Sequence, residues 1–222
     1  RAGEIETFTV QSETLGGERP IDVYLPPRMR PTRRYPLLVV FDGRDYLHFA
    51  GMRTILDNLI HRHEVESMVV AFTQSPDRLA EYAADPRLGR FVAEELVPAL
   101  EARYTLRPGP ANRGLMGASL GAVASLATAW RHQGKFGRLL LQSGSFAFTD
   151  IGKSVKSPIL EPVVGFVNEL RADPGRPVER IFVSCGTYES LIYENRSLVP
   201  LLNSTGMDVK YEEVRDGHNW EN

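Results

Sequence analysis

The sequence predicts an α/β protein whose eight-stranded, mostly parallel sheet is flanked by helices on both faces. Short apolar, β-branched runs recur along the chain, helical patterns separate the later runs, and those later runs are continuously apolar as in central parallel strands. The expected strands are Ile5–Val10, Ile21–Leu25, Leu37–Phe41, Met68–Phe72, Gly114–Met116, Leu139–Leu141, Ile181–Ser184 and Val209–Val214. Ligands of such sheets bind beyond the carboxyl ends of the parallel strands.

The first two runs alternate with polar residues around a turn at Gly16 and Gly17, which predicts an antiparallel pair with one solvated face. Asp85 followed by Pro86 is a helix-start signal that predicts the beginning of the second helix. The expected helices are Met52–Ile60, Phe91–Tyr104, Ser119–His132, Pro162–Leu170 and Leu191–Leu202.

Length and composition narrow the class of protein. The 222 residues, 42% hydrophobic and 24% charged, predict a single domain over residues 1–222. A formal charge of −2 argues against nucleic-acid binding through bulk positive charge. Cys185 is the one cysteine, which excludes an intramolecular disulfide and a multi-cysteine metal site. No apolar run is long enough to span a membrane, and we expect a cytoplasmic protein. Because the chain begins at Arg1, a leading segment removed by processing is also considered.

The segment 117–121 reads Gly-Ala-Ser-Leu-Gly, which fits the G-x-S-x-G pattern of a nucleophile elbow. An apolar strand enters it and an Ala-rich helix leaves it, so the Ser119 hydroxyl is expected to project from the sheet edge. The alternative is a Gly/Ser turn without chemistry.

A serine nucleophile needs a base and an orienting acid, and in this arrangement the acid and then the histidine follow the serine along the chain. His218 follows the last expected strand and is the candidate base. His61 and His63 lie at the polar end of a helix, and His132 ends the helix after the elbow, where a cation is favourable.

The acid should lie after the penultimate strand, where Glu189 is the first choice. Glu194 is an alternative one helical turn later, Asp216 is interpreted as a turn former, and a helix N-terminal carboxylate would explain Glu189 without catalysis. An oxyanion hole requires two amides: that of Leu120, and that of Gly43 or Arg44 in the loop after the third strand. A simple Asp-Gly turn is the alternative for that loop.

Several motifs together resemble the esterase D-like serine esterases of the α/β-hydrolase superfamily, and most closely the enterochelin (ferric siderophore) esterase branch. The similarity runs from about Phe8 to Asn222. The motifs are Arg19–Pro27, Tyr35–Gly43, Arg78–Tyr82, Glu95–Pro98, the elbow, Gln142–Phe146 and Gly217–Trp220. The resemblance implies an α/β-hydrolase fold, a nucleophile at Ser119, a base at His218 and the same oxyanion donors, and it places the acid at Glu189. It implies no cofactor and no metal.

The chain departs from the siderophore enzymes at three positions: Ala122 replaces a glycine, Tyr46 a frequent tryptophan, and Ala147 an aromatic residue. We also expect no counterpart of the extra N-terminal domain of the larger enterochelin esterases within these 222 residues. These departures bear on specificity for catecholate siderophores and leave ester hydrolysis untouched.

The expected substrate-lining residues are Tyr46, Arg78 and Phe146, with an ion pair to Glu81 as the alternative role of Arg78. No sizeable lid fits the length, and the long connection after Gln142, with Phe146, Phe148 and Ile151, is expected to form a pocket wall. The chain ends four residues after His218, so either further residues or a mobile end is expected there.

The predicted function is hydrolysis of a carboxylic ester through an acyl-enzyme. The expected partner is a small-molecule or polymer-linked ester, of siderophore type or otherwise bulky, with no nucleic acid and no membrane span. The alternatives are an acyltransferase on the same scaffold and a non-catalytic α/β-hydrolase-like binding module.

Overall fold

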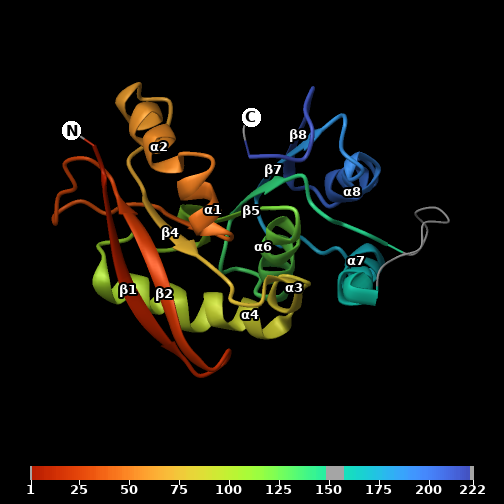
Figure 1. Cartoon of the computed structure of the whole chain (residues 1–222), viewed down its shortest axis with the longest axis horizontal. Coiled ribbons are helices and arrows are strands. Elements are labelled where there is room, and N and C mark those ends of the chain that lie inside the picture. The colour runs from red at the N-terminus through yellow and green to blue at the C-terminus, as the bar shows by residue number, and fades with distance from the viewer. Residues whose placement is uncertain (1, 149–157, 221–222) are drawn as a thin grey trace.

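The computed structural model describes residues 2–148 and 158–220 (Figure 1). The strands are β1 (Glu4–Ser12), β2 (Gly17–Leu25), β3 (Leu37–Val40), β4 (Val69–Thr73), β5 (Arg113–Ala118), β6 (Arg138–Gln142), β7 (Arg180–Gly186) and β8 (Asp208–Val214). The α-helices are α1 (Gly43–His48), α2 (Met52–His61), α3 (Arg78–Glu81), α4 (Pro86–Arg90), α5 (Val97–Arg103), α6 (Leu120–Arg131), α7 (Glu161–Ala172) and α8 (Ile192–Ser204). Three further helical segments are η1 (Phe91–Leu96), η2 (Pro110–Asn112) and η3 (Pro158–Leu160).

The strands form one sheet in the order β1-β2-β4-β3-β5-β6-β7-β8. β1 pairs antiparallel with β2 and β2 antiparallel with β4, whereas the strands from β4 to β8 are parallel. The β1–β2 hairpin projects at one end of the molecule and β7 and β8 lie at the other (Figure 1). The predicted eight-stranded, mostly parallel sheet is therefore confirmed, and so is the N-terminal antiparallel pair.

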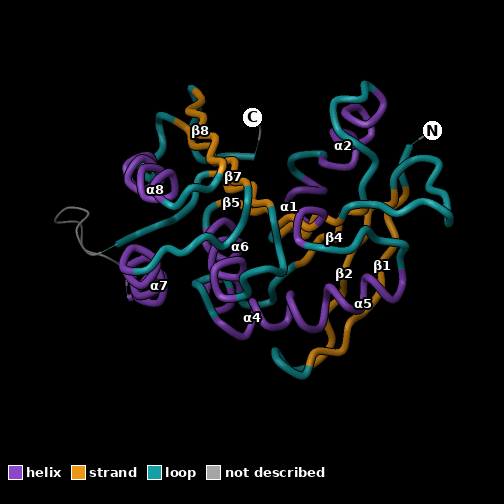
Figure 2. The backbone as a smooth tube through the Cα atoms, turned by 180° about the vertical axis from the view of Figure 1, so that it is seen from behind, coloured by secondary structure: helices purple, strands orange, loops and turns teal. Residues whose placement is uncertain are grey.

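The central strands are buried on both faces, because successive side chains point to opposite sides of a sheet. Val39 of β3 and Leu115 of β5 belong to one apolar cluster, and their neighbours Val40 and Met116 belong to another. The first and larger cluster packs under the helices α4 to α8, and the second packs under α1 and α2. Figure 2 shows α4 and α5 crossing one side of the sheet, with α1 and α2 on the other.

The predicted second helix is one helical run from Pro86 to Arg103 with a π-helical middle, η1. As expected, Asp85 is its N-cap and accepts a hydrogen bond from the Arg87 amide at 2.8 Å. Pro98 is the second residue after the π segment. A proline has no N–H and its ring collides with the carbonyl four residues earlier, so a widened turn relieves the clash.

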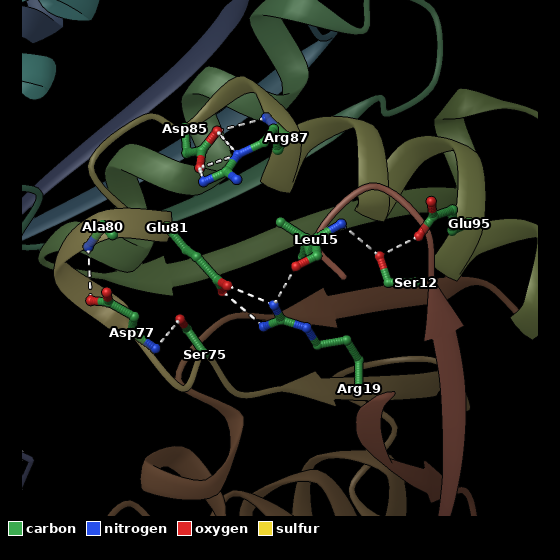
Figure 3. A network of polar contacts seen from close by, with 10 residues as sticks. All are labelled: Ser12, Leu15, Arg19, Ser75, Asp77, Ala80, Glu81, Asp85, Arg87 and Glu95. Carbon is green, nitrogen blue, oxygen red and sulfur yellow. Dashed lines mark hydrogen bonds and ion pairs between the residues drawn. The ribbon is translucent and has the colours of Figure 1, made fainter. Parts of the chain in front are cut away.

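Polar contacts attach the β1–β2 hairpin to the helical segments that follow β4, and Figure 3 shows two of them. Glu95 accepts a hydrogen bond from the Ser12 hydroxyl at 2.6 Å. Arg19 forms an ion pair with Glu81 at 2.8 Å, and both side chains are about nine-tenths buried. Both contacts bring together residues far apart in the sequence.

No helix in residues 2–148 and 158–220 is both long and apolar enough to cross a membrane.

Candidate active site

Ser119 occupies the sharp turn between β5 and α6. Its backbone has φ 56° and ψ −118°, a conformation that is strained for a residue with a side chain. The strand and helix approach each other closely here: a Cβ on Gly117 would lie 2.3 Å from the carbonyl carbon of Gly121. The strand–turn–helix geometry predicted from the glycine spacing is present.

His218 and Glu189 are in direct contact although 29 residues separate them. His218 follows β8 and Glu189 follows β7, and their side chains meet with Nδ1 2.7 Å from Oε2. The Glu189 carboxylate is 2% exposed and the imidazole 49% exposed. A carboxylate at Nδ1 favours the tautomer that donates there and leaves Nε2 as the acceptor.

The hydrogen bond at Nδ1 of His218 is made by Glu189 and not by either of the two other acids considered from the sequence. Glu194 lies in the first turn of α8. Asp216 accepts hydrogen bonds from the Gly217 amide at 2.7 Å and from the Asn219 side chain at 3.2 Å. Asp216 therefore shapes the turn before His218, as the sequence indicated.

A cavity of about 360 Å³ lies at the carboxyl edge of the sheet. Its lining includes Ser119, Glu189 and His218, together with Tyr46, Arg78 and Trp220. The Ser119 hydroxyl is 3.1 Å from the hydroxyl of Ser145. Within the described ranges of the chain, no hydrogen bond joins Ser119 to His218. The serine and the Glu189–His218 pair thus share one cavity while the serine is bonded to a second hydroxyl.

The three residues expected to supply oxyanion amides lie beside this cavity and not in its described lining. Leu120 begins α6 immediately after Ser119. Gly43 begins α1, and a Cβ there would lie 2.4 Å from the Cβ of Phe72, so packing against β4 requires this glycine. The Arg44 amide donates to Oε1 of Gln74 at 3.2 Å. Of the two amides in this loop, that of Arg44 is therefore already engaged.

The alternative role of Arg78, an ion pair with Glu81, is wrong. Nε and Nη2 of Arg78 each donate to the Asp42 carboxylate at 2.8 Å, and Glu81 pairs with Arg19 instead. Asp42 has left-handed backbone angles and is fully buried, which turns its carboxylate toward Arg78. Burial opposes the charge of Arg78, but the hydrogen bonds to Asp42 raise its pKa above the ordinary value.

Tyr46 lines the cavity as expected, whereas Phe146 does not. The Tyr46 hydroxyl donates to Gln142 at 2.6 Å, and its ring packs edge-on against Trp220 with centroids 4.8 Å apart. Burial raises the pKa of Tyr46, so the phenol stays protonated. Phe146 is 0% exposed in the larger apolar cluster, and Phe148 belongs to the same cluster. Their expected place in a pocket wall is a misassignment, and Ile151 lies outside the described residues.

Sequence reasoning missed three contributors to this site. Gln142, Ser143 and Ser145 were noted only as part of a family motif, yet each contacts a cavity residue: Tyr46, Glu189 and Ser119 respectively. The signal available was their position at the end of β6 or just after it, beside the strand that ends in the elbow. In residues 2–148 and 158–220, no group of three or more His, Cys, Asp or Glu side chains is arranged to hold a metal ion.

Comparison with known proteins identifies the fold and the family of the chain. The fold is that of the α/β-hydrolase esterases: a solved ferulic acid esterase superimposes with a TM-score of 0.82 at 19% identity, covering 99% of this chain and 92% of that one. The model of the Esterase family, described as "Putative esterase", matches residues 12–222, and the chain belongs to this family. It is accordingly a carboxylic-ester hydrolase.

Two further relatives span different shares of their own length. Protein YjcH of Bacillus subtilis (strain 168) is 24% identical over 225 residues, covering 98% of this chain and 92% of the relative. Enterochelin esterase from Shigella flexneri superimposes with a TM-score of 0.82 at 22% identity, covering 97% of this chain. This chain spans 54% of that enzyme, about half its length.

Proposed function

We propose that this esterase acts through an acyl-enzyme on Ser119, with His218 as general base and Glu189 as the acid that orients it. The observation that carries the proposal is the 2.7 Å contact between Glu189 and His218 in the cavity that Ser119 also lines. A hydroxyl is a weak nucleophile alone, and a histidine held by a buried carboxylate is the usual means of activating it.

In the first half of the reaction, Ser119 Oγ attacks the ester carbonyl carbon and its proton passes to Nε2 of His218. This step requires the hydroxyl to turn from Ser145, its partner in the structure, toward the imidazole. The negative oxygen that forms is held by the amides of Leu120 and Gly43. We favour Gly43 because the Arg44 amide is bonded to Gln74.

The tetrahedral intermediate then collapses: the bond to the alcohol oxygen breaks, and His218 gives its proton to the departing alcohol. In the second half, water attacks the acyl carbon, His218 accepts the water proton, and the free acid leaves as Ser119 regains its hydrogen. Glu189 keeps its negative charge throughout and stabilises the imidazolium formed in each half. No cofactor enters these steps.

The charges around the cavity favour a neutral, polar ester as substrate. The cation of Arg78 is already balanced by Asp42, and two further carboxylates, Asp45 and Asp216, belong to the lining. A strongly anionic ester such as a ferric catecholate would meet repulsion from those acids. Tyr46 and Trp220 offer an aromatic wall against which an acyl or aryl group can pack. A substrate panel that contains both a ferulic acid ester and enterochelin, the ester types named for the two solved neighbours, tests this preference.

The test is hydrolysis of p-nitrophenyl acetate by the native protein, Ser119→Ala and His218→Ala, with circular dichroism as the control for folding. We expect each substitution to lower the rate by about 10⁴-fold or more. Undiminished activity in His218→Ala would remove the base assignment, and undiminished activity in Ser119→Ala would remove the acyl-enzyme.

A further inference from the structure

We infer that Ser143 is a positioning residue, which holds the Glu189 carboxylate in the plane that presents Oε2 to His218. This inference rests on the proposed function, since it assigns a task within the same site. Ser143 is the first residue after β6, and Glu189 lies after the neighbouring strand β7. The contact is therefore made across two strand ends.

The two oxygens of the Glu189 carboxylate have separate partners. Oε1 accepts a hydrogen bond from the Ser143 hydroxyl at 2.6 Å and another from the Gly186 amide at 2.7 Å. Oε2 is thereby left to His218, 2.7 Å away. One donor on Oε1 would let the carboxylate pivot, whereas two donors from different strands fix the plane of the group. Removal of the Ser143 hydroxyl leaves the Gly186 amide as the described donor to Oε1.

The backbone around Ser143 holds the hydroxyl in place. Ser143 has a left-handed φ of 48°, and its amide donates to the Ser184 carbonyl of β7 at 2.7 Å. The next carbonyl, that of Gly144, accepts a hydrogen bond at 2.9 Å from the side chain of Asn195, a fully buried residue of α8. A left-handed serine is maintained only where surrounding contacts determine it. The loop is thus anchored to both β7 and α8.

The Glu189 carboxylate also lies close to Gly186, its other donor. A Cβ on Gly186 would lie 2.6 Å from Oε1, so only glycine leaves room for the carboxylate. The hydrogen bonds to Glu189 matter because its carboxylate is 2% exposed, and a buried charged group must obtain its hydrogen bonds from the protein. Ser143 supplies one of them through a side chain, which makes its contribution removable by substitution.

The test compares Ser143→Ala, Ser143→Gly and the control Ser204→Ala in steady-state hydrolysis of p-nitrophenyl acetate. Ser204 lies at the end of α8, where its hydroxyl bonds to the Leu201 carbonyl. Active sites are counted with a fluorophosphonate, so that partial unfolding does not enter kcat. We expect kcat to fall about 10-fold in both Ser143 variants with KM within about 2-fold, and no change in Ser204→Ala. Glycine should match alanine although it relieves the left-handed strain.

The second arm repeats Ser143→Ala in a Glu189→Gln background. A residue acting through Glu189 should then lower kcat by less than about 2-fold, because the carboxylate it positions is gone. A full 10-fold loss in that background, a native kcat in Ser143→Ala, or a loss in alanine that glycine reverses would each overturn the inference. Native activity in Glu189→Gln alone would instead remove the triad acid, and the inference with it. Failure of the Ser143 inference is therefore distinguishable from failure of the Glu189 assignment.

Discussion

Glu189 and Glu81 are both buried carboxylates with a basic partner, and the difference between the partners distinguishes the proposed catalytic region from a structural one. Glu81 pairs with Arg19 at 2.8 Å, and the two side chains are 9% and 11% exposed. Glu189 pairs with His218, whose imidazole is 49% exposed and lines the cavity. A guanidinium stays charged at every working pH, whereas an imidazole exchanges its proton near neutrality.

The surroundings of the two pairs differ in the same sense. The Arg19–Glu81 pair lies under the hairpin turn, where Arg19 also reaches the Leu15 carbonyl (Figure 3). The Glu189–His218 pair has its acid sealed and its base open to solvent. The comparison indicates that burial of a carboxylate is common to both roles, and that access to the partner distinguishes them.

Glu189→Gln is expected to have the largest effect of the substitutions that probe this comparison. The amide cannot stabilise an imidazolium or hold the same tautomer, so kcat should fall by roughly 10⁴-fold. The midpoint of thermal unfolding should stay close to native, because the partner His218 is half exposed and is solvated by water when the carboxylate is lost. Ester hydrolysis and a melting curve on the same sample measure both quantities. A large loss of stability would show that this pair is structural after all.

Glu81→Gln is the matched substitution in the structural region. It leaves the charge of Arg19 buried without its partner, which should cost about 3–5 kcal/mol of unfolding free energy. The kcat of the folded fraction should stay native, since Glu81 lies outside the cavity lining. Urea unfolding and assays normalised by active-site titration separate the two quantities. If kcat fell as it should in Glu189→Gln, the contrast between the regions would be lost.

Asp42→Asn tests a carboxylate that combines both settings. Asp42 is fully buried and paired with a guanidinium like Glu81, yet its partner Arg78 lines the cavity, and Gly43 follows it. We expect a stability loss of about 2 kcal/mol together with a fall in kcat, because the pair anchors the proposed oxyanion loop. Unfolding and hydrolysis measured side by side should both change. A change in stability alone would assign Asp42 to the structural class.

Ser12→Ala removes a neutral donor in the structural region. Its hydroxyl donates to Glu95 and accepts from the Leu15 amide, so its loss should cost about 1–2 kcal/mol without changing kcat. Chemical denaturation measures this cost. A value near zero would mean that the Ser12 hydroxyl does not contribute to attaching the hairpin.

The smallest expected effect is a pH dependence at an exposed pair. The hydrogen bond from Arg196 lowers the pKa of Glu213 to about 2, from 4.5 in the unfolded reference. A carboxyl with a depressed folded pKa contributes stability above its unfolded pKa and loses it as the pH falls toward the folded one. Glu213→Gln should therefore reduce the drop in melting temperature between about pH 5 and pH 3. An identical drop in native protein and variant would contradict this.

The sequence predicted contacts and positions that depend on a local pattern or on the order of elements along the chain. Ser119 stands in a strand–turn–helix pattern, and Glu189 and His218 follow the last two strands of a parallel sheet, whose ends necessarily meet at one edge. The expected ion-pair partner of Arg78 was wrong because Glu81 is only three residues away in sequence. The observed partner, Asp42, is 36 residues away and contacts Arg78 from a left-handed turn.

The remaining errors and omissions arise from packing across strands. A loop residue such as Phe146 can face a cavity or the core, and no periodicity distinguishes the two outside regular structure. The contact of Ser143 with Glu189 and that of Tyr46 with Trp220 each depend on the spatial neighbours of a strand end. Such contacts follow from the order of the strands in the sheet, which local sequence patterns do not determine.

The most direct measurement is covalent labelling of the native protein with a fluorophosphonate, followed by peptide mass mapping. Such a probe phosphonylates a hydroxyl only when a neighbouring base activates it. We predict a single adduct on Ser119, strongly slowed in His218→Ala, unaffected in rate by Glu81→Gln and absent in Ser119→Ala. No adduct on the folded native protein, or an adduct that persists in Ser119→Ala, would contradict a serine nucleophile in this esterase.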